Sequence, residues 1–350
     1  MRRGILSVLA VCIVLLFWHG QTIRNTSPLP SDYTVGIIRT NGSENSSDIL
    51  YFDKNLSHTG TTHYNYATMG NVFYAPVTYD RALYVVPQGP AKAKDAKTIL
   101  CQDLDTFEQT TFFLDQTAIY GLSVDSSAIF AANNINHQSF ISRIDRTNQT
   151  VKTSAYNDLY ISTTYAYQDK LYAFSSESTP SGLKSTLHYL DPVTLKELQR
   201  IDISEFGSDV YSAAGIDDTL YFAPLTTPQD TWNHIVCAYH ISSQTIKVIE
   251  FPYNVSHILN RDNQLYITHG NLVTGEGTAL SVFNTETGEI NTYDLGMWPG
   301  QIAINGNALY VMGTSSIAKY DLQTMKKEAE TEIPLAKGDY LSGIFTKQIV

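Results

Sequence analysis

A short strand-like segment recurs along the chain, and this repeat constrains the fold more than any other feature. The pattern of an apolar residue, an aromatic residue and a further apolar residue appears in "ALYVVP", "AIFAAN", "KLYAFS", "TLYFAP", "QLYITH" and "ALYVMG". A weaker seventh copy is "TVGIIR". The central positions of successive copies of the repeat are 42 to 49 residues apart. They are Ile37, Tyr84, Phe130, Tyr172, Tyr221, Tyr266 and Tyr310. A period of this length is typical of the four-stranded blades of β-propellers.

A polar residue follows each copy of the repeat at a strand end, before a short turn. In most copies Thr, Ser or Asn stands three residues further on, so the first side chain can accept backbone N–H groups and close a hairpin. These positions are Asp53, Asp103, Asp145, Asp191, His240, Asn284 and Asp321. Turn chemistry therefore explains them better than a binding site does.

The two ends of the repeat region predict how the ring closes. Each full repeat contains four strands, which we call A, B, C and D, and the recurring segment is strand B. The first repeat lacks strand A and begins at "YTVGIIRTN", whereas the last repeat is followed by one additional strand, "YLSGIFTKQ" (340–348). We expect this strand to complete the first blade, because that removes two open sheet edges. The sequence thus predicts an all-β, seven-bladed β-propeller over residues 33–350.

The segments "ALYVMG…KYDLQTMK" and "FNTETGEI" resemble the YVTN-type and quinoprotein-like repeats of seven-bladed β-propellers. The resemblance extends over residues 33–350 and implies a fold rather than a function. The chain lacks the Gly-His and Trp-Asp pairs of WD40 blades, the Asp-box of sialidases and the paired glycines of kelch blades. The tryptophan-docking repeat of quinoprotein dehydrogenases is also missing, which argues against their cofactor.

Composition and charge narrow the range of partners. The chain has 23 Tyr and 14 Phe among 350 residues, which favours strands, and a net charge of −11. An acidic surface repels phosphate, so we expect neither nucleic acid nor anionic lipid as a partner of the propeller.

The N-terminus has the pattern of a targeting segment. Basic "MRRG" precedes 14 apolar residues, Ile5 to Trp18. This length suits a signal peptide better than a full membrane span, and residues 1–20 are interpreted as a signal peptide or an uncleaved signal anchor. A buried helix and, through Cys12, a lipoprotein signal are weaker alternatives. Residues 21–32 form a linker, and the propeller is expected outside the cytoplasm, secreted or held at the membrane only by this segment.

The remaining cysteines, Cys101 and Cys237, lie within strands of different predicted blades. We therefore expect two free thiols rather than a disulfide. Six Asn-x-Ser/Thr sequons are also present, and they would matter only in a eukaryotic secretory host.

One face of the propeller is the expected binding surface. The A–B and C–D turns are short and share one face. The B–C segments look long, and they share the other face with the D–A connections. Aromatic residues predicted there could anchor a protein, peptide or glycan ligand, or serve only for packing. They are Trp232, Trp298, Tyr66 and Tyr160.

The same face is predicted to carry ionisable side chains. Four acids in D–A connections could attract Ca²⁺ or another divalent cation to the channel mouth, although Asp is also a common turn residue. They are Asp115, Asp158, Asp209 and Asp339. Four histidines map there too, without the spacing of a metal site, so no resident metal or other cofactor is predicted. They are His137, His234, His257 and His269.

Two functions follow from these candidates. The first is a non-catalytic binding scaffold that acts through the long-loop face, which is favoured because the sequence has no G-x-S-x-G or other catalytic motif. The alternative is a propeller lyase or hydrolase that uses a cation or a His/Asp cluster at the channel mouth.

Overall fold

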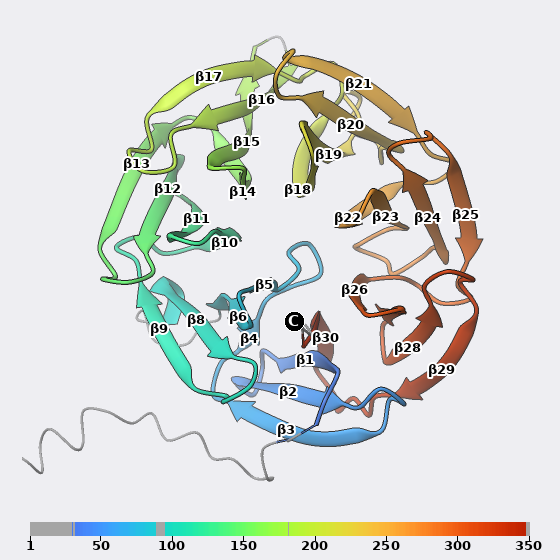
Figure 1. Ribbon diagram of the computed structural model, residues 1–350. Helices are drawn as coiled ribbons and strands as arrows, with labels where there is room; N and C mark the ends of the chain where they lie inside the picture. The colour runs from blue at the N-terminus through green and yellow to red at the C-terminus, as the bar shows by residue number, and fades with distance from the viewer. Residues whose placement is uncertain (1–29, 31, 89–94, 181, 348–350) are drawn as a thin grey trace, which may run out of the picture.

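A computed structural model describes residues 30, 32–88, 95–180 and 182–347 of the chain. Seven four-stranded antiparallel sheets are arranged in a ring around a central channel (Figure 1), which confirms the predicted seven-bladed β-propeller. The predicted targeting segment and most of the linker lie outside the described residues. Within the described part of the chain, no helix is long and apolar enough to cross a membrane.

We number the blades 1 to 7 along the chain and give the strands of each from the innermost (A) to the outermost (D). Blade 1 contains β30 (Asp339–Thr346), β1 (Val35–Asn41), β2 (Ser46–Phe52) and β3 (His58–Tyr64). Blade 2 contains β5 (Val77–Tyr79), β6 (Ala82–Val85), β8 (Thr98–Asp103) and β9 (Gln109–Phe113). Blade 3 contains β10 (Ile119–Val124), β11 (Ala128–Ile135), β12 (Gln138–Asp145) and β13 (Val151–Asn157). Blade 4 contains β14 (Tyr160–Tyr167), β15 (Lys170–Thr179), β16 (Gly182–Leu190) and β17 (Glu197–Asp202).

The last three blades follow the same order. Blade 5 contains β18 (Ser208–Ile216), β19 (Thr219–Thr226), β20 (Ile235–His240) and β21 (Thr245–Glu250). Blade 6 contains β22 (Val255–Arg261), β23 (Gln264–His269), β24 (Ala279–Asn284) and β25 (Ile290–Asp294). Blade 7 contains β26 (Gln301–Asn305), β27 (Ala308–Met312), β28 (Ser316–Asp321) and β29 (Lys327–Glu332). Two short strands, β4 (Thr68–Met69) and β7 (Pro87–Gln88), pair with each other, and a 3-10 turn, η1 (Asp95–Lys97), precedes β8.

The hydrophobic core consists of seven clusters, each formed between two successive blades. The recurring position of strand B contributes to them, and all seven of its side chains are buried. Tyr310, for example, packs with Ile37 between blades 7 and 1. The repeat therefore encodes the contact between neighbouring blades, which no single blade could bury alone.

The ring is closed by β30, as the sequence predicts. It pairs antiparallel with β1, from Val35 opposite Thr346 to Asn41 opposite Asp339. The backbone N–H of Lys347 also donates to the carbonyl of Thr34 at 3.0 Å. The first and last strands of the chain thus form one sheet with β2 and β3.

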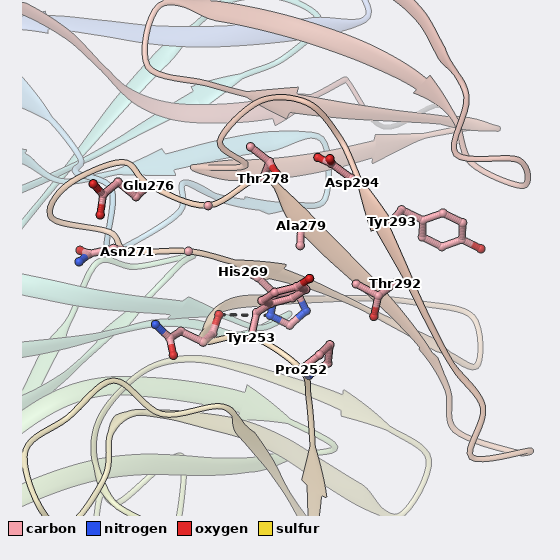
Figure 2. Close-up of a pocket in the computed structure, with 13 residues that line it drawn as sticks. Pro252, Tyr253, His269, Asn271, Glu276, Thr278, Ala279, Thr292, Tyr293 and Asp294 are labelled. Atoms are coloured by element: carbon pink, nitrogen blue, oxygen red, sulfur yellow. Dashed lines mark hydrogen bonds between the residues drawn. The ribbon is translucent and has the colours of Figure 1, made fainter.

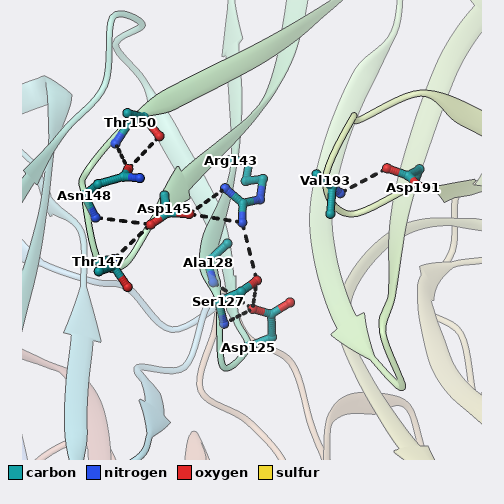
Figure 3. A network of polar contacts seen from close by, with 10 residues as sticks. All are labelled: Asp125, Ser127, Ala128, Arg143, Asp145, Thr147, Asn148, Thr150, Asp191 and Val193. Atoms are coloured by element: carbon teal, nitrogen blue, oxygen red, sulfur yellow. Dashed lines mark hydrogen bonds and ion pairs between the residues drawn. The ribbon is translucent and has the colours of Figure 1, made fainter.

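The turn chemistry predicted for the C–D hairpins is confirmed in six of seven blades. In blade 3, Oδ1 of Asp145 accepts the backbone N–H groups of Thr147 at 3.0 Å and Asn148 at 3.2 Å (Figure 3). Arg143 contacts the other oxygen of this carboxylate at 3.4 Å and Ser127 of the neighbouring A–B turn. Blade 5 differs, because Asp218 of the A–B turn, rather than His240, accepts the N–H of Ser242 at 3.2 Å.

The prediction of long B–C loops is wrong for several blades. In blades 3 and 4 the polar segments continue the two strands, and β11 and β12 are joined by only Asn136 and His137, both with positive φ. The connection in blade 1 has four residues and that in blade 7 has three. Polar residues in a sequence favour a loop, but a hairpin that extends beyond the core exposes both faces to water and so needs no apolar alternation. Long B–C connections remain in blades 2, 5 and 6. We call this side of the ring the loop face.

Cys101 and Cys237 are both free, as predicted. Cys237 is buried in the contact between blades 4 and 5, and burial raises the pKa of its thiol to about 12. A thiol with this pKa remains protonated, so Cys237 serves packing rather than chemistry.

Candidate functional site

The D–A connection between blades 1 and 2 reaches into the central channel, and we call its residues 70–76 the plug. In Figure 1 this blue loop lies before β5 and projects toward the middle of the ring. Two neighbouring blades hold its backbone: His257 of blade 6 donates from Nε2 to the carbonyl of Val72 at 2.7 Å, and Gln301 of blade 7 donates to the carbonyl of Asn71 at 3.0 Å. Because several blades hold it, the plug is a fixed part of the channel.

The plug ends in an aromatic cluster that crosses the channel. Tyr74 donates from its hydroxyl to the carbonyl of Ser162 in blade 4 at 2.8 Å, and its ring centroid lies 5.3 Å from Tyr211 of blade 5 and 6.4 Å from Tyr120 of blade 3. The Tyr160 ring joins this cluster, with its centroid 6.3 Å from that of Tyr120. Burial raises the pKa of both Tyr74 and Tyr211. The phenols of Tyr74 and Tyr211 are therefore neutral hydrogen-bonding groups at physiological pH.

The innermost strands are shaped to receive the plug. β10, β14, β18, β22 and β30 each contain one extra residue relative to the neighbouring strand. Such a bulge leaves backbone groups outside the ladder and turns a side chain toward the channel. In β14 the extra residue is Ser162, whose free carbonyl accepts the Tyr74 hydroxyl, and in β18 it is Tyr211 itself.

Asp209 lies beside this cluster at the start of β18. Its Oδ2 accepts hydrogen bonds from Ser208 at 3.3 Å and Thr226 at 3.4 Å. Burial raises its pKa despite these hydrogen bonds, which lower it.

An open groove of about 880 Å³ lies on the loop face at blade 6, and we call it the blade 6 groove. It is formed by the connection from blade 5, the B–C loop of blade 6 and the end of β25. Figure 2 shows Asn271 and Glu276 toward one end, Thr292 and Tyr293 toward the other, and His269 with Tyr253 between them.

His269, one of the predicted residues, is fixed in the floor of this groove. Its Nδ1 lies 3.2 Å from the carbonyl of Asn254 (Figure 2). Its Nε2 lies 2.7 Å from Oγ of Ser281. Burial lowers the pKa of His269 to about 4. The ring is consequently neutral at pH 7, with Nδ1 protonated to donate to the carbonyl and Nε2 accepting from the serine.

Trp298 supports the groove from behind and does not line it. Its indole lies against Gly270 and Gly275 of the B–C loop, where an added Cβ would be 3.2 and 3.8 Å from ring atoms. Both glycines have positive φ, 147° and 71°. Glycine is required at position 270 for its positive φ and because an added Cβ would lie 2.5 Å from the carbonyl oxygen of Glu276.

A second depression of about 550 Å³ on the loop face brings together three predicted residues, His137, Asp158 and Tyr160. We call it the blade 3–4 pocket. The N–H of Asp158 donates to the carbonyl of His137 at 3.1 Å, which ties the B–C turn of blade 3 to the start of blade 4. Tyr160 connects this pocket to the aromatic cluster.

The other predicted residues do not converge. Asp339 is part of a structural corner, where its carboxylate accepts from Asn41 at 2.8 Å and from the N–H of Ala336 at 2.9 Å. Tyr66 stacks on Tyr64 with centroids 6.3 Å apart. The three remaining side chains lie at separate surface positions, with Trp232 half-buried and the others exposed; they are Trp232, His234 and Asp115. In the described part of the chain, no group of three His, Cys, Asp or Glu residues is arranged to hold a metal ion.

Sequence reasoning missed the plug and Tyr74, Tyr120 and Tyr211. One signal was available, because the connection "NYATMGNVFYAP" is much longer than the other D–A connections and contains three aromatic residues. Its destination inside the channel was not predictable from its own sequence.

No protein-family model matches the chain, and no curated protein matches it in sequence. Solved structures resemble its fold at low identity. A functionally unknown protein from Desulfotomaculum acetoxidans is 10% identical with a TM-score of 0.61, and apo AztD from Citrobacter koseri is 12% identical with a TM-score of 0.54; each covers 91% of this chain and 100% of its own. The dihydro-heme d1 dehydrogenase NirN is 10% identical with a TM-score of 0.54, covering 92% of this chain and 76% of its own. These similarities establish the propeller fold alone.

Proposed function

We propose that this protein is a binding protein whose loop face holds a ligand in the blade 6 groove. The observation that carries the proposal is the groove itself. Its volume of about 880 Å³ is within the range of ligand-binding sites, and it combines apolar and hydrogen-bonding side chains. The large hydrophobic side chains of Tyr253 and Val273 are 55% and 73% exposed in the segments that form it.

The groove is also pre-organised. The His269 ring is hydrogen-bonded to the connection from blade 5, and the Trp298 indole packs against the B–C loop of blade 6. Because both segments are held in place, little conformational entropy is lost when a ligand binds. Rigid walls with an exposed aromatic ring are a common arrangement for protein, peptide or glycan ligands.

The proposal is tested with the full-length chain on peptide and glycan arrays. Tyr253→Ala removes an exposed ring and leaves the core intact, so we expect a ligand of the native protein to bind at least tenfold more weakly. Tyr340→Ala is the matched control, because Tyr340 is 40% exposed on blade 1. Equal binding by native protein and Tyr253→Ala, or equal loss in both variants, would refute a site at the blade 6 groove.

The blade 3–4 pocket supports a second candidate function, an enzyme with acid–base chemistry at the channel mouth. It gathers a histidine, a carboxylate and a phenol, His137, Asp158 and Tyr160, in one depression. Turnover of a loop-face ligand that is abolished by His137→Ala, with binding to the blade 6 groove retained, would favour this alternative. Retained turnover in that variant would exclude this trio as the catalytic group.

We also propose that residues 1–20 direct the propeller out of the cytoplasm. The basic and apolar order of this segment supports the proposal. A C-terminal alkaline phosphatase fusion should be active only when residues 1–20 are present. Activity that does not depend on them would contradict it.

A further inference from the structure

The blade 6 groove has an uncompensated negative charge. Glu276 and Asp294 are the two acids in its lining, which contains no lysine or arginine. In the described structure neither carboxylate belongs to an ion pair: Glu276 accepts from the hydroxyl of Thr274 at 3.1 Å and Asp294 from the N–H of Gly296 at 2.9 Å. These hydrogen bonds fix the carboxylates without neutralising them, so their field remains directed at whatever enters the groove.

The one basic residue of the lining does not offset this charge. His269 is neutral at pH 7, because burial lowers its pKa to about 4. Its protons and lone pairs are already committed to Asn254 and Ser281 within the protein. The groove therefore has a charge of about two negative units at neutral pH, and an anionic ligand is disfavoured.

Aromatic side chains add a second, independent preference. Tyr253 exposes 55% of its surface, and its ring meets His269 edge-on with centroids 5.8 Å apart, in a T-shaped contact. Tyr293 lines the end of the groove away from Asn271 and Glu276, as Figure 2 shows. The face of a tyrosine attracts ammonium and guanidinium groups, and this attraction is stronger where water is partly excluded.

We propose that the blade 6 groove recognises a ligand through an alkylammonium or guanidinium group that lies between Tyr253 and the carboxylates of Glu276 and Asp294. A lysine or arginine side chain of a polypeptide and a free polyamine share this chemistry. The proposal rests on the proposed binding function and specifies its ligand class.

The test measures calorimetric binding of the full-length protein to three probes: an oligolysine peptide, the same peptide with every lysine acetylated, and spermidine. We expect the lysine peptide to bind and the acetylated peptide to bind at least tenfold more weakly. Added salt should weaken the binding, because exposed charges are screened. Binding of the peptide but not of spermidine identifies a polypeptide as the source of the cation, and the reverse identifies a polyamine.

Substitutions then locate the site. Glu276→Gln with Asp294→Asn keeps the hydrogen-bond acceptors and removes both charges, and it should raise the dissociation constant at least tenfold. Glu44→Gln is the matched control, because Glu44 is an exposed acid on the B–C connection of blade 1. Melting temperatures confirm that each variant is folded.

Several results would overturn the inference: equal binding of the acetylated peptide, equal effects of the groove and control variants, or no binding of any cationic probe. Binding of an array ligand without a cation, lost in Tyr253→Ala, would refute the cation preference while leaving the proposed binding function intact. If Tyr253→Ala binds both the array ligand and the cationic probe as tightly as the native protein does, both the cation preference and the proposed binding function are refuted.

Discussion

At the scale of single residues, burial determines the protonation of two histidines. His257 donates to the carbonyl of Val72 in the plug, and His269 lies in the floor of the blade 6 groove. Burial lowers the pKa of each to about 4, from an ordinary value of 6.5. Both rings are therefore neutral hydrogen-bonding groups in the folded protein, whereas the unfolded chain would bind protons at these positions below pH 6.5.

This difference predicts how stability depends on pH. Between pH 6.5 and 4 the unfolded state binds more protons, so stability present above pH 6.5 is lost as the pH falls through this range. Each histidine contributes as much as about 3 kcal/mol. In urea unfolding from pH 7 to 4, the free energy of unfolding should fall less steeply with decreasing pH for His257→Gln than for the native protein. The control His137→Gln, which lies at an exposed turn, should show the same pH dependence as the native protein. An unchanged slope in His257→Gln would contradict the role of its burial.

At the scale of elements, the C–D turns are stabilised by side chains that replace missing backbone partners. Oδ1 of Asp103 accepts the N–H groups of Asp105 at 2.8 Å and Thr106 at 2.7 Å. The same arrangement recurs around the ring, with the exception of blade 5. It explains why a polar residue, and usually an acid, stands at this position of the repeat.

Removal of one such acceptor should have a moderate effect. Asp103→Ala leaves two N–H groups to water alone, and we expect a loss of about 1 kcal/mol in the free energy of unfolding. Asp103→Asn keeps an acceptor and should retain most of that stability. In blade 5, His240→Ala should not disrupt the turn, because Asp218 provides the acceptor there. Chemical denaturation of the three variants checks this order.

The plug is an element whose place is defined by polar contacts with distant strands. Tyr74→Phe would leave the Ser162 carbonyl without its hydroxyl donor, at a cost of about 1–2 kcal/mol, whereas Tyr74→Ala also removes a buried ring and should cost about 3 kcal/mol or more. In thermal unfolding, the native protein should therefore have the highest melting temperature, Tyr74→Phe a lower one and Tyr74→Ala the lowest. Equal stability of the two variants would mean that the ring contributes nothing to the channel.

At the scale of the whole molecule, β30 joins the two ends of the propeller. Leu341, Ile344 and Phe345 are buried, and their burial contributes about 6 kcal/mol in total. This is comparable with the net stability of an entire domain, so the ring depends on its last strand. Closure also removes the free edge of β1, which could otherwise pair with another chain.

We predict that closure of the ring requires the pairing of β30 with β1, whichever end of the chain β30 comes from. A chain that ends at residue 337 should not fold cooperatively. A circular permutant that begins at residue 336 and connects Lys347 to Thr34 by a short turn should fold, because these residues are already neighbours across the sheet. Circular dichroism and urea unfolding distinguish the outcomes. A folded truncated chain, or an unfolded permutant with intact β30, would show that closure is not what stabilises the ring.

The sequence by itself determined the features that repeat. An apolar and aromatic strand every 42 to 49 residues, with a polar turn after it, is sufficient to count the blades and to pair β30 with β1. Such features are local or recur between neighbouring repeats, so each copy supports the interpretation of the others. The lengths of the B–C connections have no such support, because a polar segment is compatible with either a loop or an extended hairpin.

Only the tertiary structure decided how the loop face and the channel are built. The plug meets His257 and Gln301 across 185 and 230 residues of chain, and Trp298 finds two glycines of another connection. Of the predicted site residues, His269 lies in the blade 6 groove with Trp298 packed against its wall, three others share the blade 3–4 pocket, and His257 holds the plug. Contacts of this kind involve segments that occur once and whose neighbours are set by the closed ring, and therefore no periodic pattern encodes them.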